Sequence, residues 1–391
     1  LNNGVQMPMQ GIGTFLLSPD EAEASATYAL KNGCQLIDTA NAYCNEKAVG
    51  RAMKNAGIDR KNIFLETKLW PSFYEQDDAV DKTLERLQTD YIDLLLIHQP
   101  AGNYIAGYKQ MEKAYKDGKV RAIGLSNFNE KQICEILNIC EVKPSVLQTE
   151  VHPYYQEKEL KKFLSHEDIK IQAWYPLGHG DNALLNEPLF KSLAEKYGKS
   201  TAQIILRWHI QEGNIIIPGS KNSDHIKANF DIFDFSLTDE EMAKISLLDK
   251  GVRYYTSTPE MLKKYVADNR IVNRGYDFHW DIGNIFDSVF RMTIDYYGQT
   301  EKRIKNVHED DLTALLSSVP PEYYQYIGPY LHTVPNMPEK ILNMPGIKET
   351  KNRFPKRIAR ELEGIEDLEF VSPYLYYVLM PESWPDYRRT M

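Results

Sequence analysis

Helical and strand-like patterns of apolar residues alternate along the first two-thirds of the chain. Apolar residues at helical spacing predict helices over residues 21–31, 46–56, 77–87, 104–116, 130–137, 157–164, 188–197, 201–211 and 237–248. Short apolar runs predict strands over residues 35–38, 63–68, 91–98, 121–126, 146–150, 170–174 and 214–217, with residues 9–14 as a weaker eighth. Alternation of this kind predicts a parallel sheet, either a closed (β/α)8 barrel or an open doubly wound sheet.

Three consecutive predicted strands end in ionisable residues. Asp38 closes the first and is followed by Tyr43, Lys68 closes the second, and His98 closes the third. If the strands are parallel neighbours, their C-terminal ends meet, and catalytic residues of barrels gather there. Each residue also fits a structural role, such as a helix cap, a solvated end or a hydrogen-bonded core histidine. The coincidence of all four at strand ends favours a shared catalytic site.

In this order and in these local contexts, Asp38, Tyr43, Lys68 and His98 resemble the catalytic tetrad of the aldo-keto reductases. The resemblance runs from Leu1 to about Val266. It implies an α/β fold of the closed (β/α)8 type, a TIM barrel, instead of an open sheet. It also implies NAD(P)H-dependent reduction of small aldehydes or ketones to alcohols.

The resemblance also implies a role for each member of the tetrad. Tyr43 would give the proton to the carbonyl oxygen. Lys68 would lower the pKa of Tyr43 as a nearby positive charge, and Asp38 would fix Lys68 in place. A neutral His98 would donate a hydrogen bond to the same oxygen. No metal ion is needed.

By the same resemblance, a second group of residues would hold the cofactor, NADPH or NADH. Ser126, Asn127 and Gln148 would bind the nicotinamide carboxamide, and Trp174 would stack on the ring. Hydroxyl and amide groups suit a neutral carboxamide, and an indole offers a flat face. Taken singly, Ser126 and Asn127 also fit a turn or helix cap, and Trp174 fits the core.

Residues 217–229 resemble the segment that holds the adenosine phosphate end of the cofactor. The candidate ligands there are Gly219, Ser220, Lys221, Asn222, His225 and Asn229. Gly219 stands where NADP-preferring members place a lysine, and His225 stands where they place an arginine. A neutral imidazole binds a phosphate dianion less well than a guanidinium does. We therefore expect weakened NADP preference, unless Lys221 takes over the role.

The resemblance places three further side chains around the substrate, beside Tyr43 and His98: Phe15, Trp70 and Gln99. The segments that follow His98 and Gln148 are short. Two of the loops that enclose substrate in longer family members therefore look trimmed, which suits a more open site for varied small carbonyls.

Charge and composition exclude several other classes of protein. A net charge of −9 argues against nucleic-acid binding, which needs a basic face. The longest apolar runs fall far short of the ~20 residues that span a bilayer, and no apolar leader is present, so we expect a cytoplasmic protein. The four cysteines lie before residue 150 without a Cys-x-x-Cys motif, which favours reduced thiols.

The composition changes after the barrel-like region, so we expect two domains, residues 1–268 and 269–391. Residues 270–391 hold ten of the 20 prolines and eleven of the 25 tyrosines. So many aromatic residues argue against disorder and predict a folded, mainly helical module, broken into short pieces by proline. Helices are expected over residues 282–290, 310–316, 338–342 and 356–363.

Tyrosine clusters in this module could bind a partner or pack internally: Tyr323, Tyr324, Tyr326, Tyr374, Tyr376 and Tyr377. Three origins remain open: a natural fused domain that binds a protein partner, a lid over the barrel mouth, or an engineered fusion of two unrelated chains. In the first and third cases the barrel could serve as a scaffold instead of an enzyme.

Overall fold

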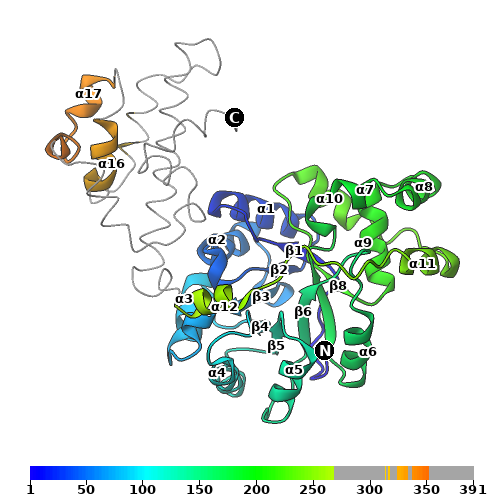
Figure 1. Ribbon diagram of the computed structural model, residues 1–391. Helices are drawn as coiled ribbons and strands as arrows, with labels where there is room; N and C mark the ends of the chain where they lie inside the picture. The colour runs from blue at the N-terminus through cyan, green and yellow to red at the C-terminus, as the bar shows by residue number, and fades with distance from the viewer. Residues whose placement is uncertain (268–312, 314–315, 318–323, 333–336, 352–391) are drawn as a thin grey trace. The chain divides into compact units, whose positions relative to one another are not determined.

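The computed structural model describes residues 1–267, 313, 316–317, 324–332 and 337–351, and these form parts of two compact units, residues 1–272 and 273–391 (Figure 1). The first unit is a parallel barrel surrounded by helices. Among the described residues, no helix has the length and apolar character required to cross a membrane.

The barrel is built from eight parallel strands in chain order. They are β1 (Gly11–Gly13), β2 (Leu36–Asp38), β3 (Phe64–Leu69), β4 (Leu94–Ile97), β5 (Ile123–Ser126), β6 (Val146–Glu150), β7 (Lys170–Trp174) and β8 (Ile215–Ile216). Each strand pairs in parallel with the next. Gln10 forms a parallel bridge to Ile216, whose backbone N–H donates to Met9 at 2.9 Å. The sheet thus returns on itself, which confirms the predicted (β/α)8 barrel.

Helices follow the strands and cover the outside of the barrel. They are α1 (Pro19–Lys31), α2 (Glu46–Ala56), α3 (Ala79–Leu87), α4 (Tyr104–Lys116), α5 (Glu130–Leu137), α6 (Lys158–His166), α7 (Asn182–Leu185), α8 (Pro188–Tyr197), α9 (Thr201–Gln211), α10 (Ser223–Phe230), α11 (Asp239–Ser246) and α12 (Pro259–Val266). The sequence pattern did not predict α7, α10 or α12.

Local capping explains where several helices begin and end. Helix α1 starts two residues before the predicted Glu21, because Ser18 and Glu21 form a capping box and Pro19 takes the first helical position. Gly57 and Gly198 end α2 and α8 in the left-handed conformation that glycine adopts without strain.

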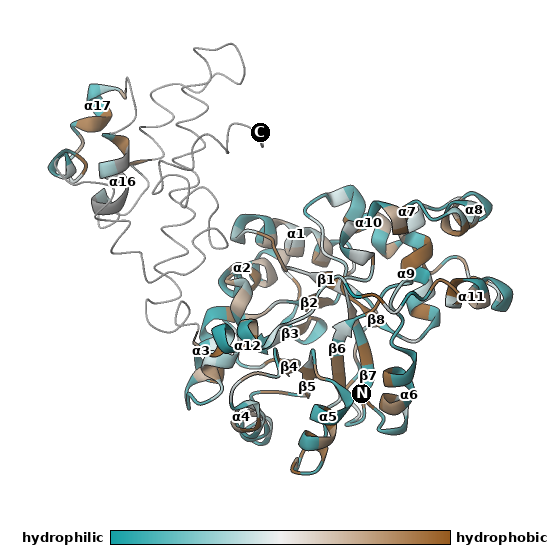
Figure 2. Cartoon of the chain, viewed as in Figure 1, coloured by the Kyte–Doolittle hydropathy of each residue, from teal (hydrophilic) through white to brown (hydrophobic). Residues whose placement is uncertain are grey.

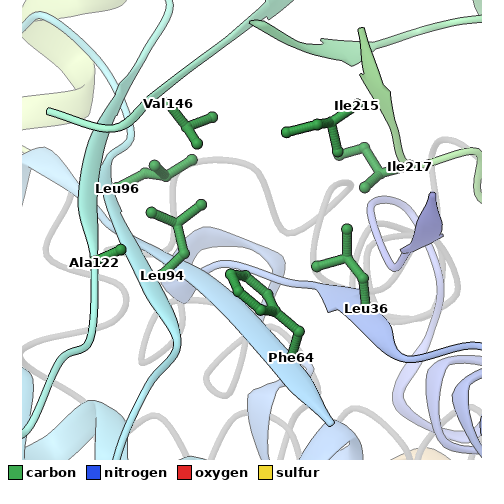
Figure 3. Packing of buried hydrophobic residues seen from close by; sticks show 8 residues of the cluster. All are labelled: Leu36, Phe64, Leu94, Leu96, Ala122, Val146, Ile215 and Ile217. Atoms are coloured by element: carbon green, nitrogen blue, oxygen red, sulfur yellow. The ribbon is translucent and has the colours of Figure 1, made fainter. Parts of the chain in front are cut away.

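Apolar side chains from five strands and from the residues next to β5 and β8 fill the barrel interior (Figure 3): Leu36, Phe64, Leu94, Leu96, Ala122, Val146, Ile215 and Ile217. Leu1, Val5 and Met7 pack against this cluster. The hydropathy colouring shows the strands mostly brown, whereas helices such as α6 and α11 carry much teal (Figure 2). Because alternate residues of a strand face the same side, the inward-facing set continues above this apolar layer into polar residues at the C-terminal ends of the strands.

The described part of the second unit contains α16 (Tyr324–Leu331), α17 (Glu339–Leu342) and a 3-10 turn, η7 (Lys348–Thr350). Its buried side chains include Leu316, Leu331, Met337, Ile341 and Ile347. Tyr324 is buried too and donates its hydroxyl hydrogen to the Leu316 carbonyl at 2.7 Å. Tyr324 therefore packs within the unit.

Helix α17 matches the helix predicted at residues 338–342, and Thr313, Leu316 and Ser317 are helical within or just after the predicted 310–316. The predicted helices at residues 282–290 and 356–363, with Tyr323, Tyr374, Tyr376 and Tyr377, lie outside the described residues, as does the side chain of Tyr326.

Candidate active site

Four residues predicted at or just after the ends of three consecutive strands meet at the C-terminal end of the barrel. Asp38 closes β2, Lys68 lies near the end of β3, and His98 directly follows β4. Tyr43 ends the short 3-10 helix η1 (Asn41–Tyr43) after β2. The Lys68 Nζ atom lies 2.5 Å from Asp38 Oδ1 and 3.2 Å from Tyr43 Oη. The Tyr43 and His98 rings meet edge to face, with centroids 5.7 Å apart.

Lys68 is fully buried and is held by three acceptors. Besides Asp38 and Tyr43, its ammonium group donates to the Thr39 carbonyl oxygen at 2.9 Å. Burial acts to lower the pKa of Lys68, but its acidic surroundings, above all the charge of Asp38, more than offset it and raise the pKa above the ordinary value. Lys68 is therefore a permanent cation beside the Tyr43 oxygen.

The Tyr43 hydroxyl remains protonated at neutral pH. Burial raises its pKa, Lys68 lowers it through charge and hydrogen bonding, and Asp38 raises it again, so that the net shift is upward. The expected lowering by Lys68 is thus present but is outweighed by burial. The phenol form is the one that can donate a proton.

His98 is a neutral imidazole in this environment. Its side chain is 7% exposed, and burial together with the Lys68 charge holds its pKa well below the ordinary value. The Nδ1 atom has no hydrogen-bond partner among the described residues. The His98 and Trp70 rings are nearly perpendicular, with ring centroids 5.0 Å apart.

A polar layer that the sequence analysis did not foresee lies beneath the tetrad, formed by Glu66 with Gln148 and Gln172. All three side chains are buried. The Gln148 Nε2 atom donates to Asp38 Oδ1 at 2.9 Å and to Glu66 Oε1 at 2.8 Å. The Gln172 Nε2 atom donates to Glu66 Oε2 at 2.7 Å. Only the pairing register of β3, β6 and β7 brings these residues together.

The candidate nicotinamide residues come from three neighbouring strands: Ser126 and Trp174 end β5 and β7, Asn127 directly follows β5, and Gln148 lies in the middle of β6. Asn127 has a left-handed backbone, with φ of 66°, and its side-chain amide donates to the His98 carbonyl at 3.1 Å and to Ser126 Oγ at 3.0 Å. Its Oδ1 atom accepts from Trp174 Nε1 at 3.0 Å. Asn127 therefore fixes the indole of Trp174, which is partly exposed.

The candidate adenosine-end residues lie between β8 and α10 and on α10 itself. A Cβ atom on Gly219 would lie 2.9 Å from the Gly13 carbonyl oxygen, so the two segments approach closely only because Gly219 lacks a side chain. Asn222 caps α10 by accepting from the backbone of Asp224 and His225.

The remaining candidate residues at the adenosine end differ in burial and in hydrogen bonding. The Ser220 Oγ atom accepts from the Asn222 N–H at 3.1 Å, and His225 is exposed. Asn229 is buried, and its carbonyl oxygen accepts from Gln10 at 2.5 Å. Lys221 pairs with Glu21 of α1, with Nζ 3.0 Å from Oε1. A partner for Lys221 was not anticipated.

Phe15, Trp70 and Gln99 all lie near the tetrad. The Phe15 ring is 39% exposed and packs on Tyr43, with centroids 5.1 Å apart. Gln99 follows His98 and is buried, and its Oε1 atom and the Trp70 Nε1 atom lack hydrogen-bond partners among the described residues.

Two tyrosines from the segment after α11 pack against Trp70 and Trp174. The sequence analysis did not predict them as site residues. Tyr265 packs on Trp70 at a centroid separation of 4.6 Å, and Tyr255 lies 5.9 Å from Trp174. Their hydroxyl groups are hydrogen-bonded to each other. The sequence marks them only by their place in the tyrosine-containing segment that follows α11.

Glu150, at the end of β6, anchors that segment. Its Oε1 atom accepts from the Tyr254 N–H at 2.6 Å, and its Oε2 atom accepts from the Tyr255 N–H at 3.2 Å. The His152 Nε2 atom lies 3.1 Å from Oε1. This buried carboxylate thus fixes the backbone that carries Tyr255 toward Trp174.

The chain is similar to known reductases over the barrel. The family model described as "Aldo/keto reductase family" matches residues 11–250, and no family model matches the C-terminal region. Glyoxal reductase of Bacillus subtilis is 44% identical over 267 residues, which cover 67% of this chain and 96% of that protein. Morphine 6-dehydrogenase of Pseudomonas putida is 42% identical over 65% of this chain and 91% of its own length.

Solved structures agree with these similarities. An aldo/keto reductase from Brucella melitensis is 44% identical and covers 64% of this chain and 96% of its own, with a TM-score of 0.62. Both the family model and the relatives therefore cover the barrel that carries the four strand-end residues. The protein belongs to the aldo/keto reductase family of oxidoreductases, whose members act on carbonyl groups.

Proposed function

We propose that this chain reduces small aldehydes and ketones to alcohols, with NADPH or NADH as the reductant and Tyr43 as the proton donor. The observation that carries the proposal is the contact between the protonated Tyr43 hydroxyl and the buried Lys68 cation, whose atoms lie 3.2 Å apart. When a hydride adds to the carbonyl carbon, negative charge develops on the carbonyl oxygen, and that oxygen needs a proton donor beside it.

Lys68 and Asp38 prepare Tyr43 for this proton transfer. As Tyr43 gives up its proton, the Lys68 ammonium group stabilises the phenolate that forms. Asp38 holds Lys68 by a 2.5 Å contact, so the lysine does not have to reorganise during the reaction. The raised pKa of Tyr43 keeps the phenol protonated before the reaction, as the reductive direction requires.

His98 acts on the same oxygen without transferring a proton. Because its pKa lies well below the ordinary value, the imidazole is neutral and can donate one N–H to the carbonyl oxygen. Contact with Trp70 fixes the ring. A carbonyl oxygen would thus receive two hydrogen bonds, one from Tyr43 and one from His98.

The chemistry of the strand-end residues fits a nicotinamide cofactor. Ser126 and Gln148 offer neutral polar groups for a carboxamide, and Trp174 offers an indole held in place by Asn127. When bound, the cofactor supplies the hydride to the carbonyl carbon. Gly219, Ser220, Asn222 and Asn229 would hold its adenosine end, where the close approach of Gly219 to Gly13 leaves no space for a Cβ atom.

We also propose that the preference for NADPH over NADH is weak. No arginine stands at His225, and the Lys221 ammonium group is paired with Glu21. A lysine that already faces a carboxylate gains less from a 2′-phosphate than an unpaired lysine would, and an exposed imidazole is a weaker anion ligand than a guanidinium.

The test is the consumption of NADH and NADPH with a panel of small aldehydes and ketones, measured for the intact chain and for Tyr43→Phe. We expect the substitution to cut turnover at least about a hundredfold while cofactor affinity is nearly unchanged, as for loss of a proton donor. Equal loss of turnover and cofactor affinity would point to misfolding and would remove the support for Tyr43. No turnover with either cofactor by the folded wild-type chain would refute the proposed reaction.

A further inference from the structure

Glu66 is an acidic residue inside the barrel that the proposed reaction does not use. It lies two positions before Lys68 on β3, so both side chains point to the barrel interior. Its side chain is completely buried. An ionised carboxylate in such a place is costly unless a cation or several hydrogen bonds compensate it.

The contacts of Glu66 join it to the tetrad and to Gln148. A single nitrogen, Gln148 Nε2, lies 2.8 Å from Glu66 Oε1 and 2.9 Å from Asp38 Oδ1. The two carboxyl groups therefore share one donor and lie side by side. Gln172 Nε2 donates to the second oxygen of Glu66 at 2.7 Å.

The charges around this pair do not balance if both acids are ionised. Among the described residues that contact Asp38 and Glu66, Lys68 supplies the cation, from β3. Gln148 on β6 and Gln172 on β7 are neutral amides, and Tyr43 and His98 are neutral in their surroundings. Two buried carboxylates against one lysine would leave an uncompensated charge, which proteins avoid by keeping a proton on one acid.

The contacts of Lys68 decide which acid keeps the proton. The Lys68 ammonium group lies directly on Asp38, at 2.5 Å, whereas Glu66 is bound by the two amides. Burial, and then the charge of Asp38, raise the pKa of Glu66 well above the ordinary value. Asp38 is thus the carboxylate and Glu66 the acid.

We propose that Glu66 is a positioning residue of the reductase site, a neutral carboxylic acid that donates its proton to Asp38 and holds the Gln148 amide turned toward the barrel interior. This inference rests on the proposed function, because Glu66 acts through Asp38, Lys68 and Gln148. It assigns Glu66 no contact with substrate.

Two consequences follow for the site. First, Lys68 faces one ionised carboxylate instead of two, so the negative charge that opposes loss of the Tyr43 proton is smaller; an ionised Glu66 would act with Asp38 to raise the pKa of Tyr43 further. Second, the hydrogens of the Gln148 amide are committed to acceptors inside the barrel. Its carbonyl oxygen is then the group left to accept a hydrogen bond from a ligand at the strand ends.

Glu66→Gln and Glu66→Leu separate these roles. Glu66→Gln keeps the shape and the neutral charge, so we expect kcat within about threefold of wild type and an unchanged pH dependence of kcat. Glu66→Leu removes the acceptor of Gln172 Nε2, one acceptor of Gln148 Nε2 and the proposed hydrogen bond to Asp38. We expect kcat/KM to fall about tenfold or more, in line with loss of buried hydrogen bonds.

A readout that needs no turnover tests the charge state directly. The infrared spectrum of the wild-type chain at neutral pH should contain the carbonyl band of a protonated carboxylic acid, and Glu66→Gln should lose it. If the wild type reduces no carbonyl compound, the proposed function fails while this band still tests Glu66. Glu112→Gln, which changes a buried carboxyl on α4, is the matched control and should leave the pH dependence of kcat unchanged.

Two results would overturn the inference. If Glu66→Gln shifts the pH dependence of kcat to lower pH by about one unit or more, and no acid band is lost, then Glu66 is an ionised carboxylate beside Lys68. If Glu66→Leu keeps the kcat, KM and pH dependence of the wild type, Glu66 positions nothing. Should Glu66→Leu fail to fold, Glu66→Gln and the infrared band still decide the question.

Discussion

The Nζ atom of Lys68 lies 2.5 Å from Oδ1 of Asp38, and both side chains are buried at the C-terminal end of the barrel. Such a pair compensates two charges that would each be expensive alone. Removing one partner leaves the other as an uncompensated buried charge, which destabilises the fold. Because Lys68 also contacts Tyr43, the same change alters the surroundings of the proposed proton donor.

We expect Lys68→Met to destabilise the barrel by about 3–5 kcal/mol, because Asp38 would remain buried without its cation. Urea unfolding followed by tryptophan fluorescence measures this. The double variant Lys68→Met with Asp38→Asn should lose less stability than the sum of the two single variants, since the uncompensated charge is gone. A Lys68→Met protein as stable as the wild type would show that the pair does not compensate buried charges.

The pair of Glu21 and Lys221 leads to a prediction on cofactor choice. We expect His225→Arg to tighten NADPH binding about tenfold or more relative to NADH, because a guanidinium binds a phosphate dianion in bidentate fashion. Glu21→Gln should release Lys221 from its 3.0 Å contact and favour NADPH by only about threefold, as expected for an exposed ion pair.

Fluorescence titration at one fixed ionic strength measures these affinities. His225→Gln is the control and should leave the ratio of the two dissociation constants nearly unchanged. A wild-type Kd for NADPH about a hundredfold tighter than that for NADH would contradict the prediction, since that ratio requires a strong phosphate ligand.

Glu150 leads to a prediction on the segment that carries Tyr255. Glu150→Gln replaces one acceptor oxygen by an amide donor that faces a backbone N–H, so we expect residues 254 and 255 to exchange their amide hydrogens about tenfold faster or more. Hydrogen exchange with mass spectrometry measures this. Glu157→Gln, which alters the partner of the Tyr155 hydroxyl, is the control. Equal exchange in the wild type and Glu150→Gln would show that the anchor contributes nothing.

Cys34 leads to a prediction on pH. Burial raises the pKa of its thiol to about 12, so at pH 8 only about one molecule in ten thousand carries the reactive thiolate. We expect iodoacetamide to label the half-buried Cys44 and Cys134 of the native chain long before Cys34. Labelling in urea is the control, because all four cysteines should then react alike. Rapid native labelling of Cys34 would contradict its burial.

The raised pKa of Cys34 also determines how the free energy of unfolding changes with pH. The thiol pKa is higher in the folded chain than its unfolded value of about 8.5. The unfolded state therefore loses its proton first, and the free energy of unfolding falls as the pH rises from about 8.5 toward 12. Cys34→Ala should reduce this decline.

Much of the barrel could be predicted from local pattern. Strands β6 and β7 and helices α2, α4, α5, α8 and α9 have the predicted bounds, because strong periodicity and capping residues mark them in the sequence. The sequence left an open sheet possible, and closure between Gln10 and Ile216 was decided by long-range pairing. The resemblance to the aldo-keto reductases, and not the apolar pattern, favoured the closed barrel over the open sheet.

For the site, the sequence by itself located Asp38, Lys68 and His98 at strand ends, since strand ends can be read from alternation and parallel strands share an edge. It could not show that Glu66 faces Gln148 and Gln172, that Glu21 pairs with Lys221, or that Glu150 anchors Tyr255. Those contacts join residues far apart in the chain. They depend on strand register and on side-chain direction within a closed barrel, which only the tertiary structure decides.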